Sequence, residues 1–598
     1  MKNQLIQTYQ NQYQAHYQKL QKNKRKLAWL ILARFLSFSL IIVLGVLIIP
    51  SHLFTGLLAT VIMLIVFIFF IWGHLQLKKK QNIIQNLCDI NRNEIEALRG
   101  NLDKFEDGKE FTNPRHSFSN DLELFGNRGL YHHINRTCTY SGKNKLAYWL
   151  IHPLKDIEEI KKRQQTLDEL KDMLSWRQQF LATGQMLHIE KYNDTQVIAW
   201  AREKDRGVHK PVYQVARFLL PLLSISAVTM WAINLMPVGY MILLLLFNRF
   251  VLWQAQKQSR PLYQKVTKQL DTLKSYARLT QHIENNTFQA EELNEQQKKL
   301  FEQKHPASKV ISKLSKISDA IESTGNMLVD LFLNTLFLWN LHQIYRLENW
   351  HQQYASSIEK WIHVIGTFDA FTSLANFSFN NPGFTNPEFS DHPVLFTEKM
   401  GHPLIPAEKR VVNDFRIDQK GEVFIITGAN MAGKSTFLRT VGVNMVLGMT
   451  GAPVCAEKMQ FQITHLFTSM NITDSLTQNE SYFYAEVKRL KHLVDQAAHA
   501  ENMMVLLDEI LTGTNTKDKE TASKAFLSRL LKMNVTSLIA THDLSLTTLK
   551  EQHPKRIDNK SFEVDLIEGE MKFDYKIREG VAKNMNALEL LRQMKLIQ

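Results

Sequence analysis

The distribution of apolar residues along the chain is uneven, and it predicts membrane helices near the start. Leu27 to Ile49 is almost continuously apolar, with Arg34 as its one charged residue, and Leu53 to Gly73 is a second, uncharged apolar run. Each run is about as long as the roughly 20 residues that a helix needs to cross the hydrocarbon core of a bilayer. A short turn separates them, so we expect a transmembrane hairpin. Two buried helices of a soluble domain are the alternative.

Basic residues flank this hairpin on both outer sides and indicate its orientation. Lys22-Asn-Lys24-Arg25-Lys26 precedes the first run, and Lys78-Lys79-Lys80 follows the second. Lys and Arg are enriched in the cytoplasmic flanks of membrane helices, so both ends of the hairpin should lie in the cytoplasm. We therefore expect a multi-pass protein of the inner (cytoplasmic) membrane whose large hydrophilic segments are cytoplasmic.

A second apolar block, Val212 to Trp253, predicts another hairpin with the same orientation. No acidic or basic side chain occurs between Arg217 and Arg249, and Asn234 to Pro237 predicts a turn. Each arm is short for a full crossing, and Pro221 interrupts the first arm. A membrane hairpin and a pair of buried helices in a soluble domain both remain open for this block.

The other stretches before the last third show helical spacing. Residues 121–170 have apolar positions at helical intervals, with a turn expected at Ser141-Gly142 and a break at His152-Pro153. Residues 257–374 have the same spacing and few helix breakers, so we expect long helices there, some of them coiled together. Within them, Met327 to Trp339 is apolar but too short to span a membrane, and we expect it in a core or a subunit contact.

A strand followed by a glycine-rich loop and a helix marks the last third of the chain. Glu422 to Thr427 predicts a buried strand, Gly428 to Ser435 fits the phosphate-binding loop pattern, and a helix should open at Lys434. The glycines let successive backbone N–H groups converge on an anion, next to the positive end of the helix. Lys434 should reach the terminal phosphates in a catalytic role, and Ser435 should ligate Mg²⁺. The residues expected to contact a nucleoside triphosphate are Gly428, Met431, Ala432, Gly433, Lys434, Ser435 and Thr436.

Two further strands should deliver acidic and imidazole side chains to the same place. Met503 to Leu507 predicts a strand that ends in Asp508 and Glu509, and Thr536 to Ala540 predicts one followed by His542. Asp508 should hold Mg²⁺, and Glu509 should orient and deprotonate the attacking water. His542 should sense the γ-phosphate, although a structural hydrogen bond would also explain it.

The composition of the chain excludes some classes of protein but does not by itself indicate a function. The chain has 598 residues, enough for several domains, and three cysteines without a CxxC pair or a Cys/His cluster. This argues against a disulfide framework or a zinc site and fits a reducing compartment. The formal charge of +14 favours an anionic partner, either nucleic acid or a membrane surface.

Several segments of the chain resemble the MutS family of DNA mismatch repair ATPases. The segments TGANMAGKSTFLRT, NESYFYAEVKRL, VLLDEILTGTNTKDKE and ATHDLSLTTL follow the order and spacing of that family's ATPase domain. GLYHHINRTCTYSGKNKLAYWLIHPLKDIEEIKKRQQTLDEL resembles the start of its core domain. The resemblance covers residues 120–175 and 390–598.

The resemblance implies a fold, a cofactor and partners. It implies an α/β P-loop (ABC-type) ATPase domain that hydrolyses ATP with Mg²⁺ and acts as a homodimer with composite sites. Asn430 in the loop matches the family pattern, and Ser481 matches the serine that reaches the partner subunit's nucleotide. ATP-driven closing and opening of a clamp on double-stranded DNA would follow.

The expected fold is this ATPase domain at the C-terminus, preceded by an all-α core and lever region and by N-terminal transmembrane helices. The expected segments are a basic cytoplasmic N-terminus (1–26), a transmembrane hairpin (27–77), a helical linker (78–119), a MutS-like helical core (120–211), a second transmembrane hairpin (212–255), a helical lever or clamp region (256–380) and the MutS-type ATPase domain (381–598).

One departure from the family affects the expected function. Members that read mismatches carry N-terminal mismatch and connector domains, where this sequence has an apolar hairpin, so direct mismatch reading is not expected. We expect a membrane-anchored, DNA-dependent ATPase. A membrane mechanochemical or transport-associated ATPase that no longer binds DNA is the alternative, and a non-hydrolysing nucleotide-gated scaffold is a third.

Overall fold

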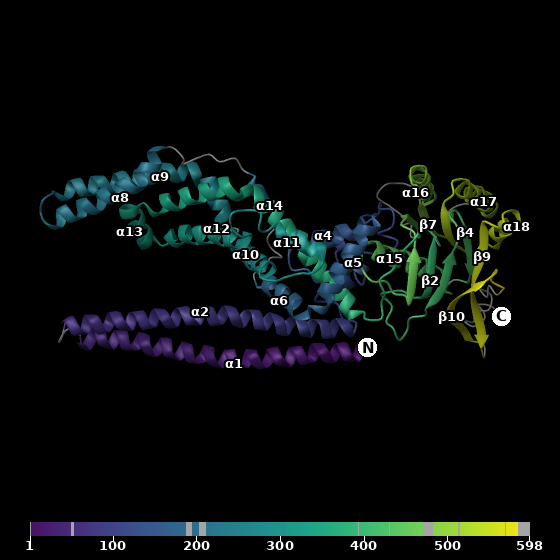
Figure 1. The fold of residues 1–598 in the computed structure, drawn as a ribbon, viewed down its shortest axis with the longest axis horizontal. Helices are drawn as coiled ribbons and strands as arrows, with labels where there is room; N and C mark the ends of the chain where they lie inside the picture. Colours follow the sequence, from purple (N-terminus) through teal and green to yellow (C-terminus); the bar gives the residue numbers. More distant parts are fainter. Residues whose placement is uncertain are drawn as a thin grey trace. The chain divides into compact units, whose positions relative to one another are not determined.

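The chain forms two compact units in the computed structural model, and each is described by itself (Figure 1). The first unit comprises Met1–Asn101, Thr137–Asn144 and Met173–Ala370, and the second comprises Leu102–Arg136, Lys145–Asp172 and Phe371–Gln598. The residues that the structure describes are 2–48, 53–186, 194–202, 211–268, 270–392, 394–429, 431–470, 482–511, 515–567 and 570–583. These units join segments that are far apart in the sequence, whereas the predicted domains are contiguous, and the predicted bounds stay predictions.

The first unit begins with two long helices that pack against each other. Helix α1 (Lys2–Val43) ends in a short π-helical stretch (Leu44–Ile48), and α2 (Leu53–Leu98) returns beside it. The hairpin is longer than the two apolar runs, because the polar residues before and after them are helical as well. There Leu20 packs against Ile84 and Cys88, so the apolar hairpin continues as a two-helix stalk.

Helices α8 (Pro211–Ala232) and α9 (Val238–Lys268) form a second hairpin, which confirms the turn predicted at residues 234–237. Asn234 adopts a positive φ of 60° in that turn. Helix α8 continues through Pro221, although proline lacks the N–H group for a helical hydrogen bond. Among the described residues, four helices are long and apolar enough to cross a membrane: α1 with its π-helical end, α2, α8 and the first part of α9.

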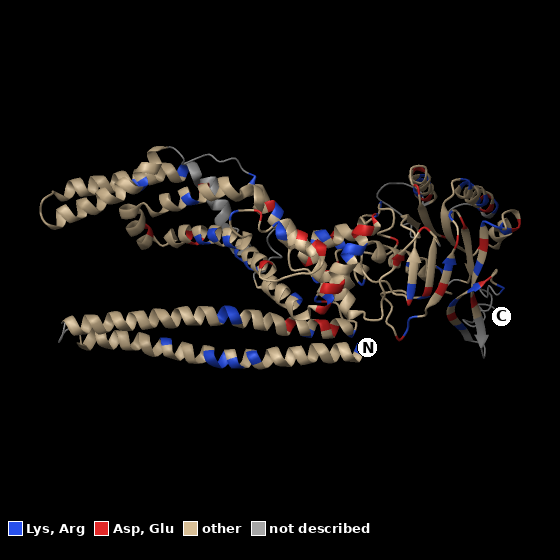
Figure 2. Cartoon of the chain, in the orientation of Figure 1, with Lys and Arg blue, Asp and Glu red and all other residues tan. Residues whose placement is uncertain are grey.

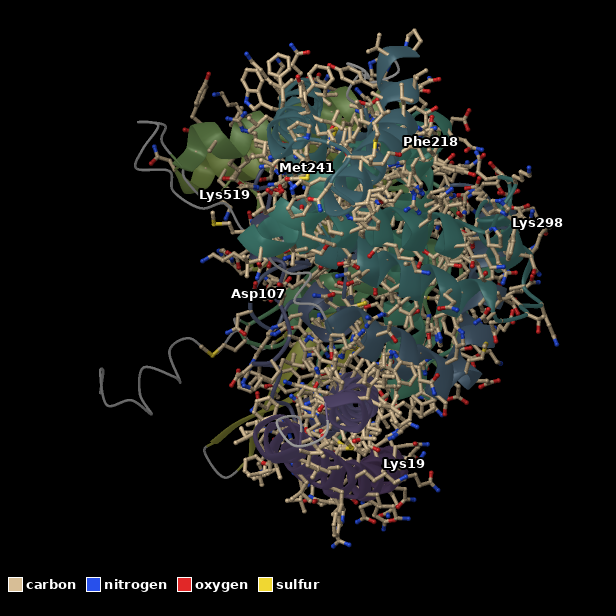
Figure 3. The ribbon with its side chains drawn as sticks, turned by 90° about the vertical axis from the view of Figure 1, so that its left-hand side faces the viewer. Lys19, Asp107, Phe218, Met241, Lys298 and Lys519 are labelled. Carbon is tan, nitrogen blue, oxygen red and sulfur yellow. The ribbon has the colours of Figure 1, made fainter. Side chains whose placement is uncertain are left out.

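Among the described residues, the part of each hairpin nearest its connecting turn carries no charged side chain. Figure 2 shows that Lys, Arg, Asp and Glu are confined to the part of α1 and α2 away from their connecting turn, and that the outer end of α8 and α9 is likewise uncharged. Large apolar side chains on these helices are exposed, among them Leu64 of α2 and Leu243 of α9. Figure 3 draws the side chains, and the labels of Phe218 and Met241 mark helices α8 and α9 in that view.

Further helices complete the first unit, and those within residues 257–374 confirm that this region is helical, although most of them are short. They are α6 (Leu174–Gln185), α7 (Asp194–Ala201), α10 (Leu270–Glu284), α11 (Glu291–Lys298), α12 (Ala307–Glu322), α13 (Met327–Phe337) and α14 (Trp339–Asn380). Helix α14 crosses from the first unit into the second, since residues from Phe371 onward belong to the second unit. An aromatic cluster of Trp176, Phe180, Phe288 and Phe368 lies in the core of the first unit.

The turn predicted at Ser141-Gly142 is wrong, because both residues lie in the first turn of helix α4 (Tyr140–Ile151). Gly142 has a packing role instead: a Cβ there would collide with the carboxylate of Asp369. That carboxylate accepts hydrogen bonds from the backbone N–H and the hydroxyl of Thr139 at 2.8 and 2.6 Å. Glycine at this position therefore lets an acid of α14 approach the start of α4. The break predicted after Ile151 is confirmed.

Two buried acids of the first unit hold this region together. Asp369 also accepts from the backbone N–H of Cys138 at 3.0 Å, and Asp194 accepts from the backbone N–H of Ser141 at 2.7 Å. Burial raises the pKa of Asp369 to about 6 and that of Asp194 to about 7. Hydrogen bonds to each carboxylate lower its pKa and so oppose the effect of burial. Asp369 accepts more of them than Asp194, which accounts for its lower pKa. We call Asp194 and Asp369 the structural acid pair.

The second unit contains two sheets. The six-stranded sheet has the order β10-β9-β4-β8-β7-β6, with parallel strands from β9 to β6 and an antiparallel β10 at one edge. Its strands are β4 (Val423–Gly428), β6 (His465–Ser469), β7 (Met503–Asp508), β8 (Thr536–Thr541), β9 (Ile557–Ile567) and β10 (Glu570–Glu579). The four-stranded sheet, of order β1-β5-β2-β3, consists of β1 (Glu388–Phe389), β2 (Leu395–Met400), β3 (Asn413–Ile417) and β5 (Lys458–Phe461). The positions predicted for the strands at 422, 503 and 536 are confirmed.

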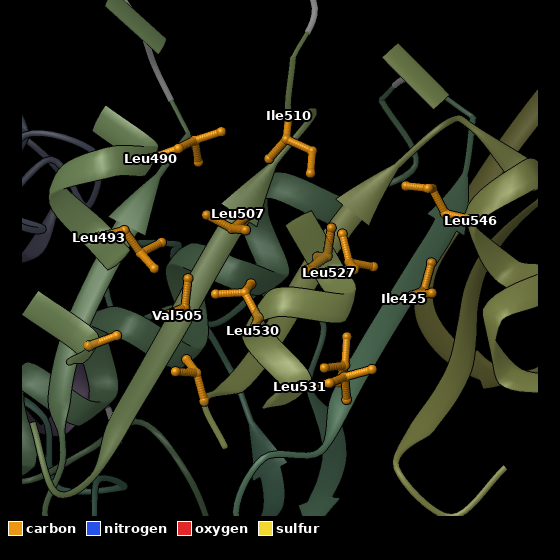
Figure 4. Packing of buried hydrophobic residues seen from close by; sticks show 14 of the residues in the cluster. Ile425, Leu490, Leu493, Val505, Leu507, Ile510, Leu527, Leu530, Leu531 and Leu546 are labelled. Carbon is orange, nitrogen blue, oxygen red and sulfur yellow. The ribbon is translucent and has the colours of Figure 1, made fainter. Parts of the chain in front are cut away.

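Helices α15 (Lys434–Met449), α16 (Tyr482–Ala497), α17 (Thr516–Lys532) and α18 (Leu549–Gln552) accompany the six-stranded sheet, and α3 (Leu130–Ile134), α5 (Ile157–Asp172) and most of α4 complete the unit. Figure 4 shows leucines of α16 and α17 packed on residues of β4 and β7. Leu493, Leu527 and Leu530 are fully buried in this cluster, against Val505 and Leu507. Burial of each such side chain contributes on the order of 1.5–3 kcal/mol, and it fixes the strand ends that carry the candidate site.

Candidate nucleotide-binding site

The glycine-rich loop lies between the end of β4 at Gly428 and the start of α15 at Lys434, as predicted. Gly428 and Gly433 have positive φ values of 149° and 108°, which glycine adopts without steric cost. A Cβ on Gly428 would collide with the carbonyl oxygen of Phe562 in β9. Met431 is largely exposed and has a φ of 68°, and Ala432 is buried. Asn430 lies outside the described residues.

The side chain of Lys434 folds back over this loop. Its Nζ atom donates hydrogen bonds to the carbonyl oxygens of Gly428 and Ala429, at 2.8 and 3.1 Å. Burial lowers the pKa of Lys434, while the nearby Glu509 and Asp508 raise it. A buried ammonium held by two carbonyls at the mouth of an N–H-rich loop is placed to exchange these partners for an anion.

The first acid of the pair, Asp508, ends β7 and contacts the first turn of α15. Its carboxylate accepts a hydrogen bond from the hydroxyl of Ser435. Burial raises the pKa of Asp508, and the bond from Ser435 opposes this rise. A carboxylate and a hydroxyl are ligands that suit Mg²⁺, which usually keeps several waters and takes few protein ligands. The donor set of these two residues therefore fits the predicted magnesium site.

The second acid, Glu509, is paired with the predicted histidine. Its Oε1 atom lies 3.1 Å from Nδ1 of His542, and its backbone N–H donates to the carbonyl oxygen of Ala540 at 3.0 Å. The pairing follows from the sheet, because β7 and β8 are neighbours and Asp508 is opposite Ala540. Glu509 has a φ of 50°, a conformation that is uncommon for residues with a side chain and often found at functional sites.

A cavity of about 440 Å³ adjoins the loop and was not predicted from the sequence. Gly433, Thr436 and Phe437 line it on the loop side, and Phe562 and Tyr575 line it from β9 and β10. Its volume lies in the range of small-molecule sites, roughly 300–1,000 Å³. Aromatic side chains beside a phosphate loop suit a flat, apolar ring such as a nucleobase.

Hydrogen bonds from Asn413 position one wall of this cavity. The Nδ2 atom of Asn413 donates to the carbonyl oxygen of Tyr575 at 3.0 Å, and its Oδ1 atom accepts from the N–H of Ile577 at 2.9 Å. Because these residues belong to β3 and β10 of different sheets, only the folded chain brings them together. No local pattern in the sequence signals this pairing.

Glu486 of α16 is a further residue of this region to which the sequence interpretation gave no role. It is buried, and its carboxylate accepts a hydrogen bond from the backbone N–H of Leu511, two residues after Glu509. A signal was present, since Glu486 shares the helical face of the buried Leu490 and Leu493, where an acid is unexpected. The predicted trans residue, Ser481, lies outside the described residues.

Comparison with known proteins gives two matches to MutS domains. Residues 116–375 match the family model for MutS domain III, and residues 424–596 match that for MutS domain V. The second match contains the loop, the acid pair and His542. Domain III includes residues of both compact units.

Curated relatives include DNA mismatch repair proteins and a MutS protein homolog. The DNA mismatch repair protein MutS of Staphylococcus haemolyticus is 27% identical over 253 residues, which are 41% of this chain and 28% of the relative. MutS protein homolog 4 of Homo sapiens is 28% identical over 305 residues, 47% of this chain and 31% of the relative. The DNA mismatch repair protein msh3 of Aspergillus oryzae is 28% identical over 252 residues, 40% of this chain and 22% of the relative. The chain thus spans less than a third of the length of these relatives. Together, the two domain matches and these relatives support the placement of this chain in the MutS family.

Proposed function

We propose that this protein is a membrane-anchored MutS-like ATPase that converts ATP and water into ADP and phosphate. One observation carries the proposal: the loop with Lys434, the Ser435–Asp508 contact and the Glu509–His542 pair meet at one edge of the parallel sheet. This is the edge at which strands β4, β7 and β8 end, where α/β sheets generally bind ligands.

Each side chain has a task that its geometry supports. The N–H groups of the loop and Lys434 bind the phosphates, and Lys434 gives up its bonds to Gly428 and Ala429 when it does so. Ser435 and Asp508 hold Mg²⁺, which supplies charge stabilisation to the transferred phosphoryl group. Glu509 orients the attacking water and accepts its proton. The cavity beside Phe437 receives the base.

His542 positions the general base in this scheme. Its Nδ1 atom lies within hydrogen-bonding distance of Glu509, and its place after β8 brings it near the expected γ-phosphate. A change in the terminal phosphate would therefore reach Glu509 through His542.

We extend the proposal to the partners of the enzyme. The relatives are named as DNA mismatch repair proteins, and the formal charge of +14 suits a polyanion, so double-stranded DNA is the proposed partner of a homodimer with composite sites. Four sufficiently long apolar helices favour anchoring in the cytoplasmic membrane, with the nucleotide site in the cytoplasm. Ser481 and Asn430 keep their proposed roles toward the partner's and the chain's own nucleotide.

The test is ATP hydrolysis by the full chain in detergent. Glu509→Gln should keep nucleotide binding and lower kcat by about 100-fold or more, because loss of a general base typically costs 10²–10⁴-fold. Glu551→Gln, at an exposed acid of α18, is the matched control and should hydrolyse ATP at the wild-type rate. Equal rates in wild type and Glu509→Gln would contradict the assignment of the base.

A second function is favoured by the same four apolar helices: a membrane mechanochemical or transport-associated ATPase that does not bind DNA. The two proposals differ in what stimulates hydrolysis. DNA should bind with an affinity that falls steeply with salt if phosphate contacts dominate. Stimulation by lipid vesicles, together with no DNA binding at low salt, would favour the second function.

A further inference from the structure

Helix α13 of the first unit exposes a face of large apolar side chains. Met327, Leu328, Leu331 and Phe332 are exposed to 83%, 76%, 56% and 59%. Their spacing puts them on one side of the helix, since residues three and four apart are neighbours on a helix surface. Such a face is costly in water and calls for an apolar environment.

The other side of α13 is fixed to the α8–α9 hairpin by polar contacts. Asp330 pairs with Arg249 of α9 at 2.8 Å and accepts a hydrogen bond from Asn334 at 2.6 Å. Asn248 of α9 donates to the carbonyl oxygen of Thr335 at 2.9 Å. These contacts set the rotation of α13 about its axis, so that its apolar face is directed away from α9.

Asn248 also joins the two arms of the hairpin. Its Nδ2 atom donates to Oγ of Ser224 in α8 at 2.7 Å, and both residues are fully buried. Hydrogen bonds between helices of this kind are a common means of association within membranes. Helices α8, α9 and α13 therefore form one packed group, with Ser224, Asn248 and Asn334 fully buried inside it and the Arg249–Asp330 pair partly exposed.

The ends of α13 are defined by the chain itself. The side chain of Asn326 caps the first turn by accepting from the N–H groups of Leu328 and Val329, and Leu338 ends the helix with a φ of 47°. Its 11 residues reach about 16 Å at 1.5 Å per residue. That is about half of the roughly 30 Å hydrocarbon core, so α13 is too short to cross a bilayer.

We propose that α13 is a half-depth membrane helix, whose exposed face contacts the acyl chains of the same bilayer that α8 and α9 cross. The inference rests on the proposed membrane anchoring. Lipid is the favoured occupant because α8 and α9, which pack against α13, expose apolar side chains of the same kind, such as Leu243. A second copy of the chain is a poorer fit: four side chains of at most about 250 Å² each offer, at these exposures, less than the roughly 800 Å² that a standard interface buries per partner.

The experiment places an environment-sensitive NBD probe on single added cysteines of the full chain, reconstituted in phosphatidylcholine–phosphatidylglycerol vesicles. Leu328→Cys tests α13, and Phe332→Cys repeats the test at a second site. Leu64→Cys, on an exposed position of α2, is the membrane control, and Phe301→Cys, an exposed aromatic after α11, is the aqueous control. The protein without an added cysteine measures background labelling of Cys88, Cys138 and Cys455.

The probes at 328 and 332 should show blue-shifted emission and lose intensity in lipids brominated near the headgroups, more than in lipids brominated deep in the chains. The probe at 64 should be quenched more by deep bromine, and that at 301 by neither. If 328 and 332 behave like 301 while 64 is quenched, the inference is wrong and the membrane anchoring stands. If 64 is not quenched either, the anchoring itself fails. Concentration-dependent crosslinking of the Leu328→Cys variant without quenching would identify a second copy as the occupant and overturn the inference.

Discussion

The protein places two carboxylates close together in each compact unit, and the two pairs do different work. In the first unit, the structural acid pair is buried, and Asp369 is held by several donors of the 138–139 segment. In the second unit, Asp508 and Glu509 follow each other at a strand end, and one contacts a serine and the other a histidine. The side chains of Glu509 and His542 are partly exposed.

This difference shows that a perturbed acid pair alone does not identify a site. Burial raises the pKa of Asp194, Asp369 and Asp508 alike. What distinguishes the second unit is access, a cation on a phosphate loop, and a backbone held at positive φ. Substitutions that change one property at a time should therefore affect nucleotide chemistry in the second unit and stability in the first.

The largest effect should come from Lys434→Ala, which removes the cation of the loop. Nucleotide affinity should fall by at least about 100-fold, or about 2.7 kcal/mol, because the phosphates lose a charge-assisted donor. Titration with a fluorescent ATP analogue measures it. Lys491→Ala, at an exposed lysine of α16, should bind like wild type, and comparable affinities of the two variants would show that the loop does not hold phosphate.

Asp369→Ala should lower the free energy of unfolding by about 3 kcal/mol, because at least three donors of Cys138 and Thr139 lose their acceptor. Chemical denaturation followed by tryptophan fluorescence measures the loss. Nucleotide affinity of the folded variant should stay at the wild-type value. An Asp369→Ala variant that is as stable as wild type but unable to bind nucleotide would contradict the structural role assigned to Asp369.

His542→Ala should lower kcat about tenfold, near 1.4 kcal/mol, because Glu509 loses the ring that orients it. Stability should change little, since His542 is half exposed. In the Glu509→Gln background the same substitution should have no further effect, because residues that act as a unit are not additive. Additive losses would assign His542 a role independent of Glu509.

The smallest effect concerns pH and Asp194. Its pKa in the folded protein, about 7, lies above the usual value of an aspartate, so between about pH 4 and 7 the folded state binds more protons than the unfolded state. The stability that Asp194 contributes is therefore present at low pH and is lost as pH rises through 7. Asp194→Asn should flatten this loss and gain about 1 kcal/mol at pH 7, measured by denaturation between pH 5 and 8. Some slope should remain, because Asp369 titrates in the same window.

The sequence predicted those parts of the candidate site that are formed by residues contiguous in the chain. Gly428 to Ser435, and the acids after residue 507, follow runs whose apolar pattern predicts strands, and the structure confirms those strands. The cavity could not be predicted, because Asn413, Phe562 and Tyr575 meet only when β3, β9 and β10 come together. Helical periodicity could have predicted that Glu486 is buried, because it shares a helix face with Leu490 and Leu493.

The same limit explains two features of the helical region that the sequence did not predict. Ser141-Gly142 has the composition of a turn, and only the approach of Asp369 explains a glycine inside a helix. The polar residues before Lys26 gave no strong apolar periodicity, yet they are helical because they pack along the second half of α2. Hydropathy alone was sufficient to predict the four apolar helices, because their length and composition do not depend on contacts with other parts of the chain.

The hydrogen bond between Glu486 and Leu511 has a consequence for the proposed homodimer. Glu486 lies on the first turns of α16, which starts directly after the segment that carries Ser481, and Leu511 lies just beyond Glu509. A displacement of α16 would therefore act on the backbone two residues beyond Glu509, the proposed general base. In the proposed homodimer, this bond would couple contact with the partner subunit near the start of α16 to the position of Glu509, so that the two sites would not hydrolyse ATP independently.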